Sequence, residues 1–212
     1  IKAVHSALTY PLTCVSGGPG TGKTSIAVGV VRSWLATGLG ANEIMLAAPT
    51  GKAAWRMGDS LSHALGQGDV LPKGQSLPKP MTIHRLLDYR PTTRDFGHHH
   101  NAPIPARGLI IDEASMIDTE LAHRLLDALR PDARIVFLGD QNQLPSVGAG
   151  AVFAAMLDIM DGGVVHLTES FRMRADDPDG SQILKIANTV CRGDAWSTSS
   201  LKQHTNPIDG RW

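Results

Sequence analysis

The chain has 212 residues and 42% hydrophobic content, enough for one sizeable core, or for one core and the start of a second domain. Lysine plus arginine and aspartate plus glutamate number 20 each, so the net charge is zero and any nucleic-acid contact must come from a local patch. No apolar run approaches the ~20 residues of a membrane span and no signal peptide is recognisable, so no membrane contact is expected. The cysteines, Cys14 and Cys191, are far apart and are expected to be reduced thiols of a cytoplasmic protein.

Short apolar runs alternate with helical patterns along the chain. Continuous rather than alternating apolar runs are typical of parallel strands that are covered on both faces. Strands are predicted over residues 12–16, 44–48, 108–112, 134–139 and 163–167. After the first of them, Ile26, Val30 and Trp34 recur at helical spacing and predict an amphipathic helix.

A second helical stripe lies between the third and fourth predicted strands. It consists of Leu121, Leu125 and Leu129, and Asp118 is its predicted N-cap. Strand–helix alternation of this kind predicts a three-layer α/β fold with a mostly parallel central sheet and right-handed crossovers.

Two stretches are predicted to be surface loops. Residues 66–80 are rich in glycine and proline, and residues 88–107 carry three prolines and three adjacent histidines. Adjacent histidines on a loop lack the spacing of metal ligands, and no cysteine lies nearby, so His98–His100 are not interpreted as a metal site.

A phosphate-binding motif follows the first predicted strand. Residues 17–24 read GGPGTGKT and fit the pattern G-x-x-x-x-G-K-[ST], between a strand and a helix as that motif requires. Backbone N–H groups and the helix N-terminus would surround a phosphate, Lys23 would reach the β- and γ-phosphates, and Thr24 would hold Mg²⁺. The residues predicted to bind the nucleotide are Gly17, Gly18, Pro19, Gly20, Thr21, Gly22, Lys23, Thr24 and Asp112.

Two adjacent carboxylates end the third predicted strand. Asp112 and Glu113 would be costly at a strand end unless their charge is used. In a P-loop protein the first carboxylate supports Mg²⁺, with Thr24, and the second orients and activates the attacking water. The alternative is an ordinary strand end that runs into an acidic turn.

Polar residues also follow the fourth predicted strand. If residues 134–139 form a parallel strand beside the Asp112 strand, Asp140, Gln141 and Gln143 emerge at the nucleotide. A glutamine both donates and accepts hydrogen bonds, so it can report whether a γ-phosphate is present, and Asp140 could orient such a network.

Six segments of the chain form an ordered set of motifs. They are GGPGTGKT (17–24), APTGKAA (48–54), TIHRLL (82–87), DEASMID (112–118), GDQNQLPSVGAG (139–150) and LTESFR (167–172). In this order they resemble the RecD family of superfamily-one DNA helicases, which includes the alpha subunit of exodeoxyribonuclease V and its stand-alone relatives. The P-loop alone identifies only a superclass, whereas the ordered set is specific and covers roughly residues 3 to 193.

The resemblance implies a role for each catalytic residue. Asp112 would support the metal and Glu113 would be the catalytic base. Gln143 would sense the γ-phosphate, whereas Gln141 is not required by the resemblance. Arg172 would contact the γ-phosphate from the second motor domain, as a finger that acts when the cleft closes.

The resemblance also implies two segments that contact DNA. Thr50 and Lys52 follow the second predicted strand and open a helix, where N–H groups and a lysine could hold a phosphate. Thr82 and His84 match a DNA-contacting segment, although a lone histidine is more often structural. A local basic strip could come from Arg56, Arg85, Arg90 and Arg94.

The implied domain organisation is incomplete. Residues 1–168 would form the first RecA-like P-loop NTPase motor domain, and residues 169–212 the truncated start of the second. The family's later motifs are missing, and an adenine-contacting glutamine would fall before Ile1. The chain is therefore expected to be a fragment that binds nucleotide weakly and does not unwind DNA.

The leading hypothesis is an ATP- and Mg²⁺-dependent helicase or translocase on single-stranded DNA, which moves from five-prime to three-prime in recombination and double-strand-break repair. Whether it works alone or with RecB- and RecC-like subunits is left open. One alternative is the helicase domain of a conjugative relaxase. Another is a P-loop ATPase switch that binds a partner protein and has no DNA track.

Overall fold

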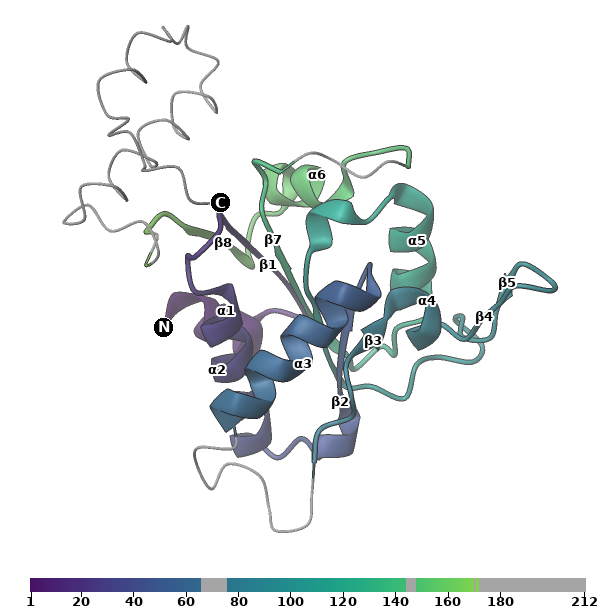
Figure 1. Ribbon diagram of the computed structural model, residues 1–212, viewed down its shortest axis with the longest axis horizontal. Helices are drawn as coiled ribbons and strands as arrows, with labels where there is room; N and C mark the ends of the chain where they lie inside the picture. The colour runs from purple at the N-terminus through teal and green to yellow at the C-terminus, as the bar shows by residue number, and fades with distance from the viewer. Residues whose placement is uncertain (66–75, 144–147, 170, 172–212) are drawn as a thin grey trace, which may run out of the picture. The chain divides into compact units, whose positions relative to one another are not determined.

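The computed structural model of the 212-residue chain describes residues 1–65, 76–143, 148–169 and 171. Residues 1–170 form one compact unit with helices around a central sheet (Figure 1). The described helices are α1 (Lys2–Thr9), α2 (Lys23–Ala36), α3 (Gly51–Leu65), α4 (Ile83–Leu86), α5 (Thr119–Asp127) and α6 (Val152–Ile159). Short 3-10 helices cover η1 (Ala41–Glu43) and η2 (Ala114–Met116).

In the described part of the chain, six strands form the central sheet in the order β3-β2-β6-β7-β1-β8, and every neighbouring pair is parallel. The strands are β1 (Leu12–Gly17), β2 (Ile44–Ala48), β3 (Met81–Thr82), β6 (Gly108–Ile111), β7 (Arg134–Gly139) and β8 (Val164–Leu167). The five predicted strands are confirmed, as is the three-layer α/β fold with a mostly parallel sheet. The short edge strand β3 and helix α1 were not predicted.

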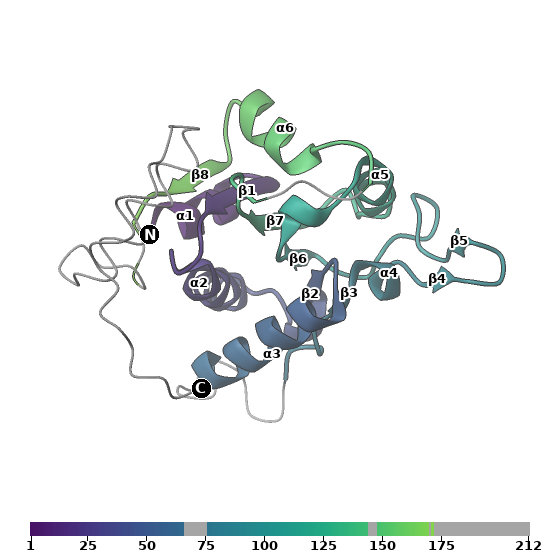
Figure 2. The same cartoon turned by 45° about the horizontal axis from the view of Figure 1, so that its top comes forward.

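Alternate residues of each strand enter two hydrophobic cores, one on each face of the sheet. In β7, Val136 and Leu138 join the core under α1, α2 and α3, whereas Ile135 and Phe137 join the core under α4, α5 and α6. Figure 2 shows α2 and α3 on one side of the strands and α5 and α6 on the other. Because burial of each such side chain contributes about 1.5–3 kcal/mol, both faces select apolar residues, and the strands read as continuous apolar runs.

The predicted helix after β1 is α2, and its apolar face is fixed by Trp34. The indole is fully buried, and its Nε1 donates a hydrogen bond to the Ala7 carbonyl oxygen at 3.4 Å. Gly108, at the start of β6, lies so close that an added Cβ would stand 2.7 Å from the Trp34 ring. The helix therefore packs against both α1 and the sheet, which holds the loop before α2 in place.

The predicted N-cap of α5 is confirmed. The Asp118 carboxylate accepts a hydrogen bond from the Leu121 backbone N–H at 2.8 Å, and Leu125 is fully buried. The helix ends at Asp127, so Leu129 lies beyond it, although its side chain still packs against the same core.

The prediction that residues 88–107 are a plain surface loop is wrong in two places. Strands β4 (Tyr89–Arg90) and β5 (Asp95–Phe96) form an antiparallel hairpin that projects from the unit (Figure 1). Further on, Ile104 is buried and its backbone N–H donates to the Ala128 carbonyl at 2.8 Å. Strands this short have no periodicity to recognise, and the flanking prolines dominate the pattern. Of the other predicted loop, residues 76–80 are irregular and residues 66–75 lie outside the described ones.

The base of this hairpin is an aromatic cluster that includes His84. Its ring packs edge-on against Tyr89 with ring centroids 5.5 Å apart, and lies 6.2 Å from Phe96. The Arg124 guanidinium lies over the Phe96 ring at 5.7 Å. His84 therefore has a packing role of its own, in line with the structural alternative for a lone histidine. No helix among the described residues is long and apolar enough to cross a membrane.

Candidate active site at the carboxyl end of the sheet

Three predicted segments meet because of the strand order. Strand β7 lies between β6 and β1, with Phe137 opposite Ile111 and Gly139 opposite Ser16. All three strands are parallel, so their carboxyl ends reach the same edge of the sheet. The glycine-rich loop after β1, the carboxylates after β6 and the turn after β7 are therefore neighbours, and the expectation that residues 134–139 pair with the Asp112 strand is confirmed.

The loop that leads into α2 depends on glycine. Gly20 has φ +77° and Gly22 has φ +88°, a left-handed conformation that other residues adopt at a cost. Gly22 is the residue before the first turn of α2. Gly17 has no room for a side chain, because an added Cβ would lie 2.5 Å from the Thr21 hydroxyl oxygen. That hydroxyl donates to the Gly18 carbonyl at 2.8 Å and closes the loop.

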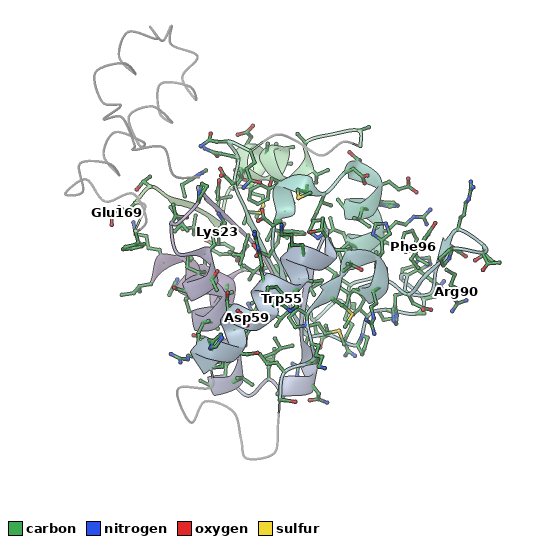
Figure 3. The ribbon with its side chains drawn as sticks, in the orientation of Figure 1. Lys23, Trp55, Asp59, Arg90, Phe96 and Glu169 are labelled. Atoms are coloured by element: carbon green, nitrogen blue, oxygen red, sulfur yellow. The ribbon has the colours of Figure 1, made fainter. Side chains whose placement is uncertain are left out.

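Lys23, which is labelled in Figure 3, lies in the first turn of α2 and contacts the start of this loop. Its ammonium nitrogen donates to the carbonyl oxygens of Gly17, at 2.5 Å, and Gly18, at 3.1 Å. Thr24 is exposed in the first turn of α2, and Pro19 is exposed in the loop. A positive charge thus lies at the N-terminus of a helix, where the helix dipole also favours an anion.

Asp112 directly follows β6 and is partly buried. Burial raises the pKa of its carboxyl group, and the nearby Glu113 carboxylate raises it further. Two effects oppose this: the Glu113 backbone N–H donates to Asp112 Oδ1 at 2.9 Å, and the Lys23 ammonium lowers the pKa through its charge. The Asp112 carboxylate and the Lys23 ammonium therefore interact electrostatically across the site.

Glu113 has an unusual backbone. Its φ of +53° and ψ of +41° are left-handed, and it leads into η2. For a residue with a side chain this conformation costs on the order of 1–2 kcal/mol and persists only where the surroundings hold it. Its backbone carbonyl accepts from the Met116 N–H at 3.0 Å, which helps to hold it. Strain of this kind is common at functional sites.

The turn after β7 is built around a buried carboxylate. Asp140 is only 4% exposed, and its Oδ1 accepts from the Asn142 N–H at 3.0 Å. Its backbone carbonyl accepts from the Gln143 N–H at 3.1 Å, and the Ser16 hydroxyl accepts from the Gln141 N–H at 3.3 Å. Asp140 thus orders the turn that carries Gln143, and its predicted part in a network at the γ-phosphate stays a prediction.

Both sides of this turn contact the segment after Glu113. The Ser115 hydroxyl donates to Gln143 Oε1 at 3.5 Å, the long end of the hydrogen-bond range. Further along, the N–H and hydroxyl of Thr119 both donate to the Ala149 carbonyl, at 3.1 and 2.9 Å. Gly150, with φ +94°, packs so tightly on Thr119 that no side chain would fit. Neither Ser115 nor Thr119 was singled out from the sequence, because no residue pattern predicts these contacts.

The segments predicted to contact DNA lie at the starts of two helices. The Thr50 hydroxyl accepts from the Ala53 N–H at 3.2 Å, and the Thr82 hydroxyl accepts from the Arg85 N–H at 3.2 Å. Both threonines therefore cap a helix, α3 and α4. Lys52 is exposed in the first turn of α3. Arg172 and residues 172–212 lie outside the described residues, so the predicted finger and second domain stay predictions.

A glycine loop between strand and helix, with a lysine across it and a carboxylate at a neighbouring strand end, defines a P-loop nucleoside triphosphatase domain of the RecA-like type. The family model described as "AAA domain" matches residues 1–149, and the chain belongs to that family.

Curated relatives confirm the resemblance to RecD. The chain is 38% identical over 201 residues to "RecBCD enzyme subunit RecD" of Mycolicibacterium smegmatis, which covers 91% of this chain and 35% of that protein. It is 36% identical over 203 residues to "ATP-dependent RecD2 DNA helicase" of Deinococcus radiodurans, covering 95% of this chain and 25% of the relative. The chain thus spans about a quarter to a third of the length of these curated relatives.

Solved structures agree on the fold. The Pif1 helicase of Candida albicans superposes with a TM-score of 0.58 at 22% identity, over 95% of this chain and 45% of that one. A Pif1 helicase from a Bacteroides species, in complex with ADP-AlF4, gives a TM-score of 0.53 at 20% identity, over 95% and 47% of the two chains. The predicted RecA-like fold is therefore confirmed.

The partial burial of Asp112 leads to a prediction about stability. Asp112→Asn removes a charge that burial disfavours, so it should raise the free energy of unfolding at neutral pH by about 1 kcal/mol. Because the folded-state pKa is raised, the destabilising effect of ionisation is present at neutral pH and fades as the pH falls through that pKa. The advantage of the variant should therefore shrink toward acid pH.

Urea unfolding of the 212-residue chain at several pH values measures this difference. Asp158→Asn, which changes an exposed carboxylate on α6, is the matched control and should have little effect. A variant at Asp112 that is less stable than the wild type at neutral pH would show that the carboxylate supports the fold.

Proposed function

We propose that this chain is the first motor domain of an ATP-dependent DNA helicase or translocase that moves on single-stranded DNA. The observation that carries the proposal is the meeting of Lys23, Asp112, Glu113 and Gln143 at one edge of the sheet. The 36% identity to a protein named as an ATP-dependent RecD2 DNA helicase supports the choice of DNA as the track.

The residues present fit ATP with Mg²⁺. The loop offers helix-terminal N–H groups and the Lys23 ammonium to phosphate, and Asp112 and Thr24 supply hard oxygen ligands of the type that Mg²⁺ prefers. When bound, Mg²⁺ would offset the negative charge of the β- and γ-phosphates. The remaining loop residues, Gly17 to Gly22, would surround those phosphates with their backbone.

Catalysis would be divided between two neighbouring strand ends. The carboxylate oxygens of Glu113 would accept the proton of the attacking water. The left-handed backbone would fix the direction in which the Glu113 side chain leaves the main chain. Gln143 would contact the γ-phosphate through its amide while Asp140 holds the turn in place. Arg172 would complete the site from the second motor domain, which we propose to begin at residue 169.

DNA would lie across the helix starts. The N-terminus of α3 and the Lys52 ammonium would hold one phosphate, and Thr82 and His84 would contact the strand beside the hairpin. We further propose movement from five-prime to three-prime, in recombination and double-strand-break repair. The relatives include both a RecBCD subunit and a RecD2 helicase. The protein would therefore work either with RecB- and RecC-like partners or alone.

The experiment that tests this function is ATP hydrolysis by the full-length protein with and without single-stranded DNA. We expect a several-fold rise in turnover with DNA, because a translocase couples each cycle to a step. A switch that binds a partner protein would show the same rate in both conditions. The 212-residue chain alone should not separate strands, and measured unwinding by it would contradict the proposed need for a second domain.

Gln143→Ala should separate nucleotide binding from DNA coupling. Removing one aligned amide should lower DNA-stimulated hydrolysis by about 10–100-fold, while ATP still binds, because the P-loop is unchanged. Steady-state ATPase assays and equilibrium binding of a fluorescent ATP analogue measure the two quantities. Gln141→Ala, an exposed glutamine on the same turn, is the matched control and should behave as the wild type. Equal losses in both variants would mean that the turn, rather than the Gln143 amide, matters.

A further inference from the structure

A groove of about 660 Å³ lies between α3 and the segment that runs through β3 into α4. This volume is within the range of sites that hold small organic ligands, roughly 300–1,000 Å³. On the α3 side it is lined by Trp55, Asp59 and Ser62, and on the opposite side by Lys79, Thr82 and Arg85. Thr82 already has a predicted DNA contact and Arg85 belongs to the predicted basic strip, whereas Trp55, Asp59, Ser62 and Lys79 have no role assigned so far.

Trp55 is the most unusual member of this lining. Trp55 is 70% exposed, whereas Ala54 and Met57, on the inner face of the same helix, are only 3% and 4% exposed. The helix therefore has its buried face elsewhere and does not need the indole for packing. A large aromatic side chain held in solvent at the wall of a groove is typical of a binding surface. Figure 3 labels Trp55 and Asp59 on α3.

The opposite wall carries two cationic side chains, Lys79 and Arg85, for which the described part of the chain provides no ion pair. By contrast, Arg90, Arg107 and Arg130 each pair with a carboxylate at 3.5 Å or less. Unpaired cations on one wall of a groove are available to an anion. The Trp55 wall has the opposite sign, since Asp59 lies one turn further along α3 and its carboxylate oxygen lies 3.6 Å from the His63 ring nitrogen.

These charges define how a polyanion would lie in the groove. Phosphates are attracted to the Lys79 and Arg85 wall and repelled from Asp59, so the bases of a single strand must face α3. The face of the exposed indole then meets the face of a base. Every base has an aromatic face, so this contact does not depend on sequence.

We propose that Trp55 stacks on a base of single-stranded DNA while Lys79 and Arg85 hold the adjacent phosphates. The proposal rests on DNA as the track of the motor, and adds a base contact to the phosphate contacts at Lys52 and Thr82. Trp55 is a binding residue here and takes no part in the hydrolysis of ATP.

The test is equilibrium binding of fluorescently labelled single-stranded DNA by the full-length protein, without nucleotide. Trp55→Ala should weaken binding by roughly 5- to 100-fold, the range found for loss of one base–aromatic stack. Trp55→Phe should retain most of the affinity, because it keeps an aromatic face. Trp55→Leu is the matched control for apolar area, and should lose as much as alanine does. Since the side chain is exposed, the melting temperature should not change.

The salt dependence distinguishes a base contact from a phosphate contact. The slope of log affinity against log salt should be unchanged in the Trp55 variants, since no phosphate contact is lost. It should fall by about 0.7 in Lys79→Gln or Arg85→Gln, each of which removes one such contact. On a strand of abasic sugar phosphates, Trp55→Ala and wild type should bind equally.

The outcomes separate this inference from the proposed function. Wild-type protein that binds single-stranded DNA while Trp55→Ala or Trp55→Leu binds equally well would overturn only the stacking role. A wild type that does not bind single strands, and whose ATP hydrolysis they do not stimulate, would overturn both.

Discussion

Replacing Glu113 with glutamine in the full-length protein is expected to lower DNA-stimulated ATP turnover by about 10²–10⁴-fold, the usual contribution of a general base. Glutamine keeps the size of the side chain and the left-handed backbone at this position, but it cannot accept a proton from water. ATP binding should stay close to that of the wild type, because the P-loop and Lys23 are untouched. Steady-state hydrolysis and equilibrium nucleotide binding measure the two effects.

The control for this substitution is Glu120→Gln. Glu120 is an exposed carboxylate in the first turn of α5, and its nearest cation is Arg124 at 3.9 Å. Loss of this surface pair should leave turnover unchanged. If Glu113→Gln retained wild-type turnover, the proton would have to be accepted elsewhere, and the assignment of the base would be wrong.

Replacing Lys23 with glutamine is expected to lower ATP turnover by about 10²–10³-fold, the scale of losing one preorganised donor to a developing negative charge. Glutamine has no positive charge for the phosphates. The substitution also affects Asp112, because the Lys23 ammonium lowers the pKa of its carboxyl group. Without the ammonium the protonated carboxyl group is favoured, and that form is a poorer ligand for Mg²⁺.

Hydrolysis by full-length Lys23→Gln, with and without single-stranded DNA, measures this effect. Lys2→Gln, an exposed lysine on α1, removes the same charge outside the site and should have no effect. DNA-stimulated turnover that survives in Lys23→Gln would contradict the whole mechanism. Retained binding of DNA by this variant is expected, since no residue of the Trp55 groove has changed.

The sheet and its edge could be predicted from local pattern. The apolar runs before Gly17, Asp112 and Asp140 are continuous because both faces of each strand are covered. Parallel pairing then brings the three strand ends together without further information. The sequence thus predicts which segments meet at this edge, because each of them directly follows a strand.

Contacts between segments could not be predicted. The hydrogen bond from Ser115 to Gln143 joins residues 28 positions apart, and its existence depends on how two loops turn after their strands. The burial of Asp140 is of the same kind, because a carboxylate in a polar turn normally reads as exposed. The hairpin at residues 89–96 has strands of two residues each, too short for any period to appear.

The exposure of Trp55 is another feature that could not be predicted from the sequence. Trp55 immediately follows the APTGKAA segment, in a helix where a tryptophan would ordinarily be assigned to the core. The helix turns its alanines and Met57 inward instead, and the indole is left outside. Whether Trp55 is buried depends on how α3 is rotated about its axis against the sheet. That rotation is set by the tertiary packing and cannot be read from the local sequence.

The strand order also determines when the central sheet can fold during synthesis of the chain. Of the six described strands of the sheet, β1 is made first, yet both of its neighbours, β7 and β8, are made last. Until they arrive, β1 has two open edges and the loop that follows it has no rigid base. Parallel pairing over such sequence separation is slow, and the waiting chain is prone to aggregate. Affinity for nucleotide should therefore emerge late, as a sign that the whole sheet has assembled.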